Sequence, residues 1–479
     1  MSGPSEAPAD TAQTALAQVL AVLKARADSS LAELIEFASL PSISAQSQHA
    51  PDMQRAAEWL ASRLRQAGLS TVELWPTAGH PAVYAEWLGA KGAPTILVYG
   101  HYDVQPPDPL ERWKTPPFTP TVVGERIYGR GVSDDKAPLL LTVQVADAYL
   151  AATGRLPVNV KFLFEGEEEM GSAHLPALVA ERAERLGADF VLSADGGMWS
   201  AETPSLTVSA RGIAALEFTV RGPAKDLHSG RHGGSVHNPL HAIATLVASL
   251  HDERGQVAVD GFYDGVEERT PEQRHSTAQL PFSDEAYLIQ TGAPSVYGEE
   301  GFGTLERQWH RPTLELNGLW GGYTGEGSKT VLPSEAHAKV TCRLVPGQDP
   351  ARISALIEAH LQAHLPPGVT LEVRLSDHQA RAYHLPPDHL GGQVARQVLA
   401  EVYGQAPLEV GMGGSIPVLE TFLGTLGLHT VFFSFAVGDE DIHAPNEFFR
   451  IARLAQGQES WARYWWNLAE SAAQQEPRA

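Results

Sequence analysis

The sequence predicts an α/β fold with a largely parallel central sheet, interrupted by an inserted α+β domain. Up to residue 208, strand-like apolar runs alternate with segments of helical length and periodicity. From residue 209 the chain becomes rich in strands joined by Gly- and Pro-rich loops, and after residue 385 the first pattern returns. A chain of 479 residues is also too long for one hydrophobic core.

These changes of pattern predict the domain boundaries. We expect residues 12–208 and 385–479 to form one domain and residues 209–384 to form the inserted domain. Residues 1–11 are rich in Ser, Pro, Ala and Asp, so we expect them to be disordered.

The expected elements of the first domain follow from their periodicity. Helices are predicted at TAQTALAQVLAVLKARA, LAELIEFASL and QRAAEWLASRLRQAGL. Strands are predicted at STVELW, AVYAEWL and PTILVYG, then at VNVKFLF and ADFVLSAD, with a helix over 136–153 and another after Gly171. After residue 385 come a helix at QVARQVLAEVYG, a strand at TVFFSFAVG and a final helix. The carboxyl ends of parallel strands are where the chemistry of such sheets collects.

The inserted domain has fewer clear signals. IAALEFTVRG and AHAKVTCRLVP are predicted strands, and HNPLHAIATLVASL is a predicted helix. Long Gly- and Pro-rich loops separate them, so we expect an α+β arrangement without internal repeats.

The bulk composition excludes several classes of partner. Lys and Arg total 35 against 57 Asp and Glu, a formal charge of -22, which argues against nucleic acids and anionic membranes. Cys342 is the single cysteine, which excludes intramolecular disulfides and thiolate zinc sites. No apolar run approaches the roughly 18 residues of a membrane-spanning helix, and MSGPSEAPAD lacks the features of a signal peptide. We therefore expect a cytoplasmic protein.

Polar residues follow the predicted strands of the first domain. His101 and Asp103 stand two positions apart after PTILVYG, so the strand period directs both side chains to the same side. A histidine ligand commonly donates its second N–H to a carboxylate, and this pair fits that arrangement. The alternative is a solvated histidine beside a turn aspartate. Asp134 and Asp135 precede a predicted helix, where one aspartate would suffice as the N-cap.

The stretch EGEEEMGS crowds carboxylates at a strand end. Glu168 and Glu169 follow VNVKFLF, and the next strand ends at Asp195. An acidic turn facing a helix N-terminus would explain the glutamates alone. Together with His443, in the loop after TVFFSFAVG, they instead complete a set of ligands for two metals that share one carboxylate. Nitrogen and oxygen donors suit Zn²⁺, Mn²⁺ or Co²⁺, and two cations about 3.5–4 Å apart would keep such carboxylates ionised.

Five motifs resemble those of a known family. GHYDVQP, GRGVSDDKAP, EGEEEMGS, SADGG and IHAPNEF, in that order, are similar to motifs of the co-catalytic (di-zinc) metallopeptidases that include carnosinase, carboxypeptidase G and aminoacylase. KDLHSGRHGG, GYTGEGSKTVLP, CRLVPGQDP and GGSIPV resemble the branch of cytosolic non-specific dipeptidase and carnosinase. The resemblance covers nearly all of the chain after residue 30.

The resemblance implies a fold and an activity. The fold would be an aminopeptidase-like catalytic domain with an inserted lid domain that also forms a homodimer. Two divalent ions per subunit, Zn²⁺ first and Mn²⁺ or Co²⁺ as alternatives, would support hydrolysis of dipeptides or short peptides with a free carboxylate. A metal-bridging water, activated by a glutamate, would attack the amide.

The resemblance also implies roles for single residues. The implied metal ligands, with Asp134 bridging, are His101, Asp134, Glu169, Asp195 and His443. Glu168 would be the general base, and Asp103 would orient His101. The bond between Asp134 and Asp135 resembles the family's cis peptide. Ala137 stands where the family commonly has glycine, and we expect only a local change in packing there.

Further implied residues lie outside the metal centre. His228 of the partner subunit would polarise the scissile carbonyl, and Thr330, Arg343, Gly414 and Ser415 would bind the substrate carboxylate. The local chemistry agrees, because arginine offers a bidentate fork and a glycine-rich segment before a helix offers free N–H groups.

Two other functions stay open on the sequence. An N-acyl-amino-acid amidohydrolase also cleaves an amide beside a free carboxylate, so the same residues would serve it. A non-catalytic binding relative would have lost a ligand or the base, and none of these positions is lost.

Overall fold

The computed structural model describes residues 9–376 and 379–475, which form two compact units. Unit 1 comprises the described residues within 1–208, 385–409 and 421–479, and unit 2 those within 209–384 and 410–420. Helix α1 begins at Ala9, so the expectation of disorder was wrong for residues 9–11. Residues 1–8 lie outside the described ranges.

The segment Val410–Glu420 differs from the prediction, which assigned it to the first domain. The structure places it in unit 2. Its polar contacts explain why: the Arg211 N–H donates to Met412 O at 3.1 Å, and the Arg381 N–H donates to the Glu420 carboxylate at 2.6 Å.

Unit 1 is built on a six-stranded sheet of order β1-β2-β6-β3-β7-β17. The pairs β6–β3, β3–β7 and β7–β17 are parallel, whereas β1–β2 and β2–β6 are antiparallel. The α/β prediction with a largely parallel central sheet is confirmed. The strands of this sheet are β1 (Thr71–Trp75), β2 (Ala82–Trp87), β3 (Thr95–His101), β6 (Asn159–Glu165), β7 (Phe190–Ser193) and β17 (Thr430–Phe432).

The remaining elements of unit 1 surround this sheet. Its helices are α1 (Ala9–Ala25), α2 (Ala27–Ala38), α3 (Ala50–Gln66), α4 (Ala137–Thr153), α5 (Leu175–Glu181), α6 (Ala183–Leu186), α13 (Leu390–Tyr403) and α15 (Ile451–Gln475). A second, three-stranded sheet has the order β18-β5-β4, with strands β4 (Thr121–Val123), β5 (Arg126–Tyr128) and β18 (Phe448–Arg450).

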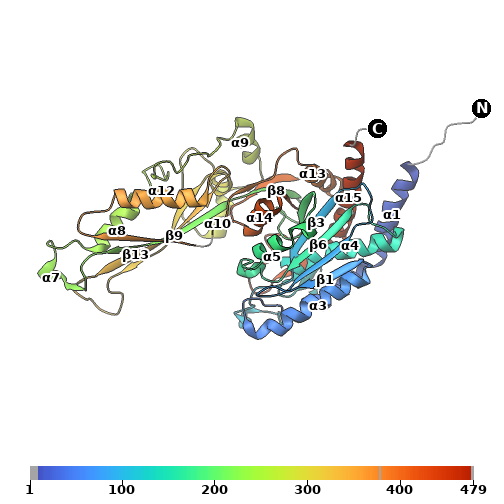
Figure 1. The fold of residues 1–479 in the computed structure, drawn as a ribbon, viewed down its shortest axis with the longest axis horizontal. Helices are drawn as coiled ribbons and strands as arrows, with labels where there is room; N and C mark the ends of the chain where they lie inside the picture. The colour runs from blue at the N-terminus through green and yellow to red at the C-terminus, as the bar shows by residue number, and fades with distance from the viewer. Residues whose placement is uncertain (1–8, 377–378, 476–479) are drawn as a thin grey trace, which may run out of the picture. The chain divides into compact units, whose positions relative to one another are not determined.

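Helix α4 lies at the centre of unit 1. Its sequence APLLLTVQVADAYLAAT is apolar on nearly every side, and it packs against β3 on one side and against α1 and α15 on another. A helix without a polar face is stable only when neighbours cover it all round. Helix α3 packs against β1 and β2 (Figure 1). This packing fixes the strand ends that carry the polar residues.

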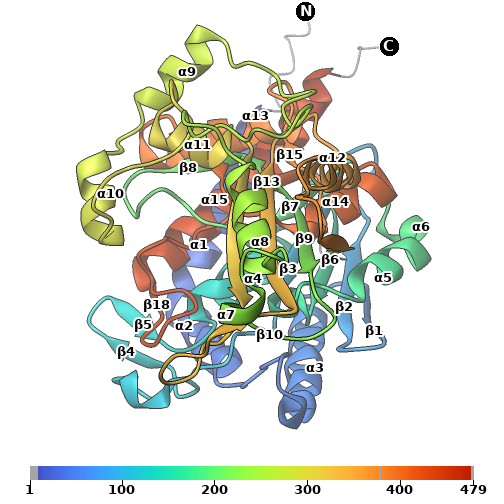
Figure 2. The same ribbon diagram turned by 90° about the vertical axis from the view of Figure 1, so that its left-hand side faces the viewer.

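Unit 2 contains a four-stranded antiparallel sheet of order β11-β13-β9-β14. Helices α8 and α12 pack on one face of it (Figure 2). The even-numbered residues of β9 and β13 are buried on that face. The sheet strands are β9 (Gly212–Arg221), β11 (Thr313–Gly321), β13 (Glu335–Leu344) and β14 (Thr370–Leu375). The helices are α7 (Ser229–His232), α8 (Pro239–Ala248), α9 (Pro271–Ala278), α10 (Asp284–Thr291), α11 (Thr304–Trp309) and α12 (Pro350–Ala363).

Short strands complete the fold. The pair β10 (Leu227–His228) and β12 (Val331–Leu332) belongs to unit 2. The chain passes between the units at four places: within β8 (Ser205–Ala210), directly after β15 (Tyr383–His384), within β16 (Leu408–Met412) and at the end of α14 (Pro417–Thr421). Strands β15, β8 and β16 form one sheet.

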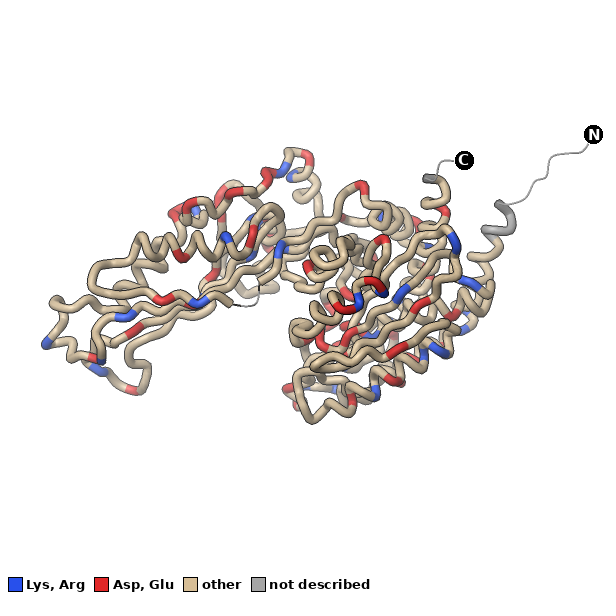
Figure 3. Tube along the Cα trace, in the orientation of Figure 1, with Lys and Arg blue, Asp and Glu red and all other residues tan. Residues whose placement is uncertain are grey.

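Charged residues are distributed along both units. In Figure 3, Lys and Arg positions are scattered and interspersed with more numerous Asp and Glu positions, as the formal charge of -22 requires. The absence of a nucleic-acid partner stays a prediction. In the described ranges, no helix combines the length and the apolar character needed to cross a bilayer.

Candidate functional site

Five predicted ligands lie together in unit 1 as two groups that share one aspartate. The first group is His101, Asp134 and Asp195, and the second is Asp134, Glu169 and His443; within each group one ligand atom per residue lies within 4.8 Å of the others. Asp134 Oδ1 lies 3.0 Å from His101 Nε2, and its Oδ2 lies 2.9 Å from His443 Nε2. Glu169 Oε2 lies 3.1 Å from the same His443 nitrogen. The two oxygens of Asp134 therefore serve different groups, as a bridging carboxylate requires.

Strand topology explains why residues distant in sequence meet here. His101 is the last residue of β3 and is paired with Glu165, the last residue of β6. Glu168 and Glu169 follow on a short turn, Glu168–Met170, and Asp195 follows β7. Because parallel strands end at one edge of the sheet, these loops converge there.

The loop that carries Asp134 is held by a residue that the sequence analysis did not single out. The buried carboxylate of Glu447 accepts hydrogen bonds from the N–H groups of Gly131 (2.8 Å), Ser133 (2.9 Å) and Asp134 (3.2 Å). Arg130 Nη1 donates to it at 2.8 Å. Glu447 lies within IHAPNEF, but nothing in that motif distinguishes it from a solvated glutamate.

The backbone of this loop is tightly constrained. Gly131 has a φ of 78°, and a side chain there would collide with Val104. The peptide bond between Asp134 and Asp135 is cis, and Asp135 Oδ2 accepts the His101 N–H at 3.2 Å.

Asp103 contacts both the histidine and the glutamate turn. Its Oδ1 lies 3.4 Å from His101 Nδ1, although its own carbonyl oxygen is closer to that nitrogen, at 3.1 Å. The same carboxylate accepts the N–H groups of Glu168 (3.3 Å) and Glu169 (3.2 Å) and the hydroxyl of Ser44 (2.6 Å). Asp103 therefore links His101 to the turn that carries the glutamates.

The electrostatics of the cluster reflect burial and crowding. Burial lowers the pKa of His101, but hydrogen bonds to Asp103 and Asp134 outweigh it and hold the pKa well above its usual value. Burial and the neighbouring carboxylates raise the pKa of Glu168 well above its usual range, because the opposing effect of His101 is smaller. Burial also raises the pKa of Asp195 to about 6. Such a density of carboxylates is compatible with ionised side chains only when cations compensate them.

The donor set fits divalent metals. Imidazole nitrogens and carboxylate oxygens, with no sulfur among the predicted ligands, are the donors preferred by Zn²⁺, Mn²⁺ and Co²⁺. The Glu169 carboxylate is also held in position by Gln105, whose Nε2 donates a hydrogen bond to Glu169 Oε2 at 2.8 Å. Gln105 is a second residue that the sequence analysis missed; it stands in the GHYDVQP motif, two positions after Asp103.

The predicted substrate residues lie in unit 2 and form two pairs. Arg343 Nη1 donates to Ser415 Oγ at 2.9 Å. Thr330 O accepts the Ser229 N–H at 3.0 Å, beside His228, whose Nδ1 accepts the Gly230 N–H at 3.0 Å. That contact leaves Nε2 of the exposed His228 side chain free of hydrogen bonds within the described part of the chain.

Gly414 lies in the segment between β16 and α14, next to Ser415. No backbone acceptor contacts the N–H groups of Gly414 and Ser415 in the described residues. The predicted metal ligands thus belong to unit 1 and the predicted carboxylate-binding residues to unit 2.

The sequence matches a family model, Peptidase family M20/M25/M40, over residues 97–467. It is 30% identical over 464 residues to the Cys-Gly metallodipeptidase dug1 of Schizosaccharomyces pombe, covering 94% of this chain and 97% of that protein. It is 28% identical over 397 residues to the Beta-Ala-His dipeptidase of Homo sapiens, covering 81% of this chain and 78% of that protein.

Two solved structures of peptidases also match nearly the whole chain. The di-peptidase Dug1p from Saccharomyces cerevisiae matches with a TM-score of 0.75 and 28% identity, covering 95% of this chain and 98% of that chain. The M20 family metallo-carboxypeptidase Sso-CP2 from Sulfolobus solfataricus matches with a TM-score of 0.79 and 32% identity, covering 92% and 99%.

Proposed function

The chain belongs to peptidase family M20/M25/M40, and from that premise we propose how its residues hydrolyse dipeptides or short peptides that carry a free carboxylate. It is a metal-dependent peptidase similar to the dipeptidase and carnosinase branch. The observation that carries the proposal is the division of the Asp134 carboxylate between His101 and His443.

Two divalent cations, Zn²⁺ first and Mn²⁺ or Co²⁺ as alternatives, would be held by this cluster. His101 and Asp195 would bind one ion, Glu169 and His443 the other, and Asp134 both. When bound, such ions act as Lewis acids and lower the pKa of a coordinated water toward about 7.

Glu168 is the proposed general base. Three observations support this role. Glu168 lies on the turn whose N–H groups contact Asp103, it interacts electrostatically with His101 and Asp195, and it belongs to neither ligand group. It would accept a proton from the attacking water and return it to the leaving amine. Burial raises its pKa above the usual value of a glutamate, and a more basic carboxylate is a better proton acceptor.

The proposed role of Asp103 is to position His101 and the glutamate turn, without taking part in the reaction itself. Its carboxylate is fully buried, lies beside His101 and accepts the N–H groups of the glutamate turn. This contact would fix the imidazole and the turn that carries the base in one arrangement.

Unit 2 supplies the proposed contacts to the ends of the substrate. Arg343, Ser415 and the free N–H of Gly414 would bind the substrate carboxylate, with the guanidinium as the charged donor. His228 and Thr330 would act from the partner subunit, where His228 would donate to the carbonyl oxygen as negative charge develops on it. Donors of this kind contribute about 3 kcal/mol to transition-state stabilisation.

A homodimer through the inserted domain is part of the proposal. Strand β11 is an edge strand of the unit 2 sheet and exposes Leu316, Leu319 and Trp320. Exposed edges with apolar side chains are suited to pairing with a second chain. A cytoplasmic location is proposed because one cysteine allows no intramolecular disulfide.

The test is hydrolysis by protein that has been stripped of metal with a chelator and then given Zn²⁺, Mn²⁺ or Co²⁺. Unblocked dipeptides are compared with N-acetyl and N-succinyl amino acids. Restored cleavage of dipeptides alone supports the proposal. Cleavage of acylated amino acids alone keeps the metal and base assignments but makes the chain an amidohydrolase, and no cleavage of either supports a non-catalytic binding role.

A further inference from the structure

Two arginines share the face of the unit 2 sheet that α8 and α12 do not cover. Arg343 on β13 is paired with Ile213 on β9, and Arg211 stands two residues before Ile213. Because side chains alternate along extended chain, Arg211 and Arg343 point to the same side. The neighbours Cys342 and Leu344 point the other way, into the core against the helices.

Neither arginine has an acidic partner. Arg343 Nη1 donates to the Ser415 hydroxyl, and Arg211 donates through Nε to Gly413 O at 2.9 Å and through Nη1 to Arg307 O at 3.3 Å. The ion pairs of the described residues include neither guanidinium. Burial, and then the neighbouring Arg343, lower the pKa of Arg211 to about 10, so the Arg211 guanidinium is cationic at neutral pH. Two partly buried cations without an anion are unfavourable unless a ligand supplies the anion.

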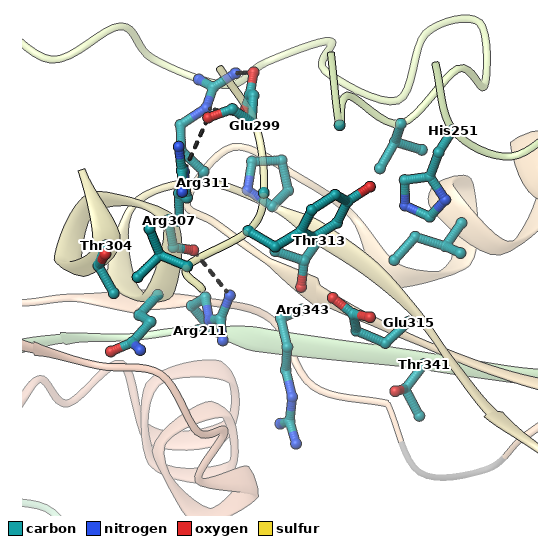
Figure 4. Close-up of a pocket in the computed structure, with 18 of the residues that line it drawn as sticks. Arg211, His251, Glu299, Thr304, Arg307, Arg311, Thr313, Glu315, Thr341 and Arg343 are labelled. Atoms are coloured by element: carbon teal, nitrogen blue, oxygen red, sulfur yellow. Dashed lines mark hydrogen bonds and ion pairs between the residues drawn. The ribbon is translucent and has the colours of Figure 1, made fainter. Parts of the chain in front are cut away.

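Both arginines line a cavity of about 770 Å³ that lies within unit 2. At the opposite side of the cavity in Figure 4, Arg311 donates to Glu299 at 2.7 Å. Glu315, on the neighbouring strand β11, lines the same cavity, and its charge partly opposes the lowering of the Arg211 pKa. It forms no ion pair with either Arg211 or Arg343 in the described part of the chain. The volume lies in the range of small-molecule sites, and the cationic groups at its Arg211–Arg343 side select an anion.

The segment between the two guanidiniums adds further donors. Arg211 donates a hydrogen bond to the Gly413 carbonyl, and Arg343 donates one to the Ser415 hydroxyl. The segment 413–415 is therefore hydrogen-bonded to an arginine at each end. The N–H groups of Gly414 and Ser415 stay available, as described above. One substrate carboxylate would occupy Arg343 and these donors, which leaves Arg211 to bind a second negative charge.

We propose that Arg211 and Arg343 form a subsite for a dicarboxylate, so that the enzyme prefers peptides whose C-terminal residue is aspartate or glutamate. This inference rests on the proposed function, since it extends the carboxylate site assigned there. The α-carboxylate would bind Arg343 and Ser415, and the side-chain carboxylate would bind Arg211. The guanidinium suits this role because its donors can contact a carboxylate in pairs.

The test compares kcat/KM for alanyl-glutamate and alanyl-glutamine, whose C-terminal side chains have nearly the same shape. The wild-type enzyme should prefer alanyl-glutamate by about tenfold or more, the value of one hydrogen bond to a charged group. In Arg211→Gln, kcat/KM for alanyl-glutamate should fall about tenfold further than kcat/KM for alanyl-glutamine. In Arg211→Lys, part of the preference should return.

Arg307→Gln is the matched control. It removes one positive charge from the wall of the same cavity, while the Arg307 carbonyl that Arg211 contacts remains. The wild-type preference should persist in it. An equal fall for both substrates in Arg211→Gln would mean that Arg211 only holds the Gly413 segment, and a wild-type enzyme without preference would overturn the proposal directly.

A binding measurement separates this proposal from the proposed function. Calorimetric titration of wild-type protein with free L-glutamate and L-glutamine requires no turnover. Glutamate should bind about tenfold more tightly, and Arg211→Gln should remove the difference. If peptides are not cleaved but this discrimination is present, the activity assignment fails and the dicarboxylate subsite stands; equal binding of the two amino acids rejects the subsite.

Discussion

His443 Nε2 lies 2.9 Å from Asp134 Oδ2, the carboxylate oxygen that Asp134 does not direct toward His101. In the sequence, the whole of unit 2 lies between these two residues. Their contact makes Asp134 the common member of both ligand groups, so a change at either group should affect the other.

Glu168→Gln should lower kcat by about 10²- to 10⁴-fold, because the amide cannot accept a proton from the attacking water. Metal content should remain that of the wild type, since Glu168 belongs to neither ligand group. Steady-state kinetics and elemental analysis of the same preparation check both statements. The matched control is Glu181→Gln, an exposed glutamate on α5, which should behave as wild type. Near-normal turnover in Glu168→Gln would falsify the base assignment.

His101→Ala should reduce both metal content and activity. The imidazole is fully buried and contacts Asp134, so its loss removes one ligand and disturbs the shared carboxylate. We expect less than two metal ions per chain by elemental analysis and activity near background. His275→Ala, at an exposed position of α9, serves as the control. Wild-type metal content in His101→Ala would exclude His101 as a ligand.

Glu447→Ala should destabilise unit 1. The substitution leaves Arg130 buried without its anion and frees three backbone N–H groups, and breaking such a pair costs about 3–5 kcal/mol in the free energy of unfolding. Urea unfolding of the metal-free protein measures this loss. The partly exposed pair of Glu459 with Arg463 gives the comparison, since Glu459→Ala should cost less than about 1 kcal/mol. Equal effects of the two substitutions would contradict the anchoring role of Glu447.

Arg343→Lys should raise KM for unblocked dipeptides by about tenfold with a smaller change in kcat. Lysine keeps the charge but loses the planar fork that can contact a carboxylate and Ser415 together. A dipeptide with an amidated C-terminus should respond little to the substitution, because it has no carboxylate to bind. If both substrates lose affinity to the same extent, Arg343 acts on the fold of unit 2 and not on the carboxylate.

His310 should make unit 2 sensitive to acid. Burial, and then the nearby Arg269, lower the pKa of His310 to about 3. The unfolded chain therefore binds more protons than the folded one between about pH 6.5 and 3, so the free energy of unfolding falls as the pH drops through that window, by up to about 1.4 kcal/mol per pH unit. Above about pH 6.5 His310 contributes no pH dependence.

His310→Gln should reduce this slope. Urea unfolding at pH 7.5, 6 and 5 compares it with wild type, and the exposed His275→Gln is the control. A slope that is the same in all three proteins would show that His310 is not the group responsible.

The residues of the two candidate ligand groups could be found from the sequence because most of them follow strand ends. His101, the glutamate turn and Asp195 each follow an apolar run, and parallel pairing brings such ends to one edge. Their partners could not be predicted in this way. Glu447 contacts Gly131 across 316 positions of sequence, and Arg211 contacts Gly413 across 202, so only the tertiary fold makes these contacts visible.

The boundaries of the two units were also only partly predictable from the sequence. Residues 410–420 follow the predicted helix of the first domain and precede its last strand, so their place in the sequence favoured that domain. Their hydrogen bonds to Arg211, Arg343 and Arg381 instead place them in unit 2. Such side-chain contacts leave no periodic signal.

The order of the ligands along the chain has a consequence for synthesis. His101, Asp134, Glu169 and Asp195 leave the ribosome before the whole of unit 2, whereas His443 and Glu447 follow it. Because N-terminal segments fold first during translation, the nascent chain passes through a stage in which four of the proposed ligands are present and the loop that carries Asp134 lacks its hydrogen bonds to Glu447. The proposed two-metal centre could therefore be completed only after unit 2 has been synthesised.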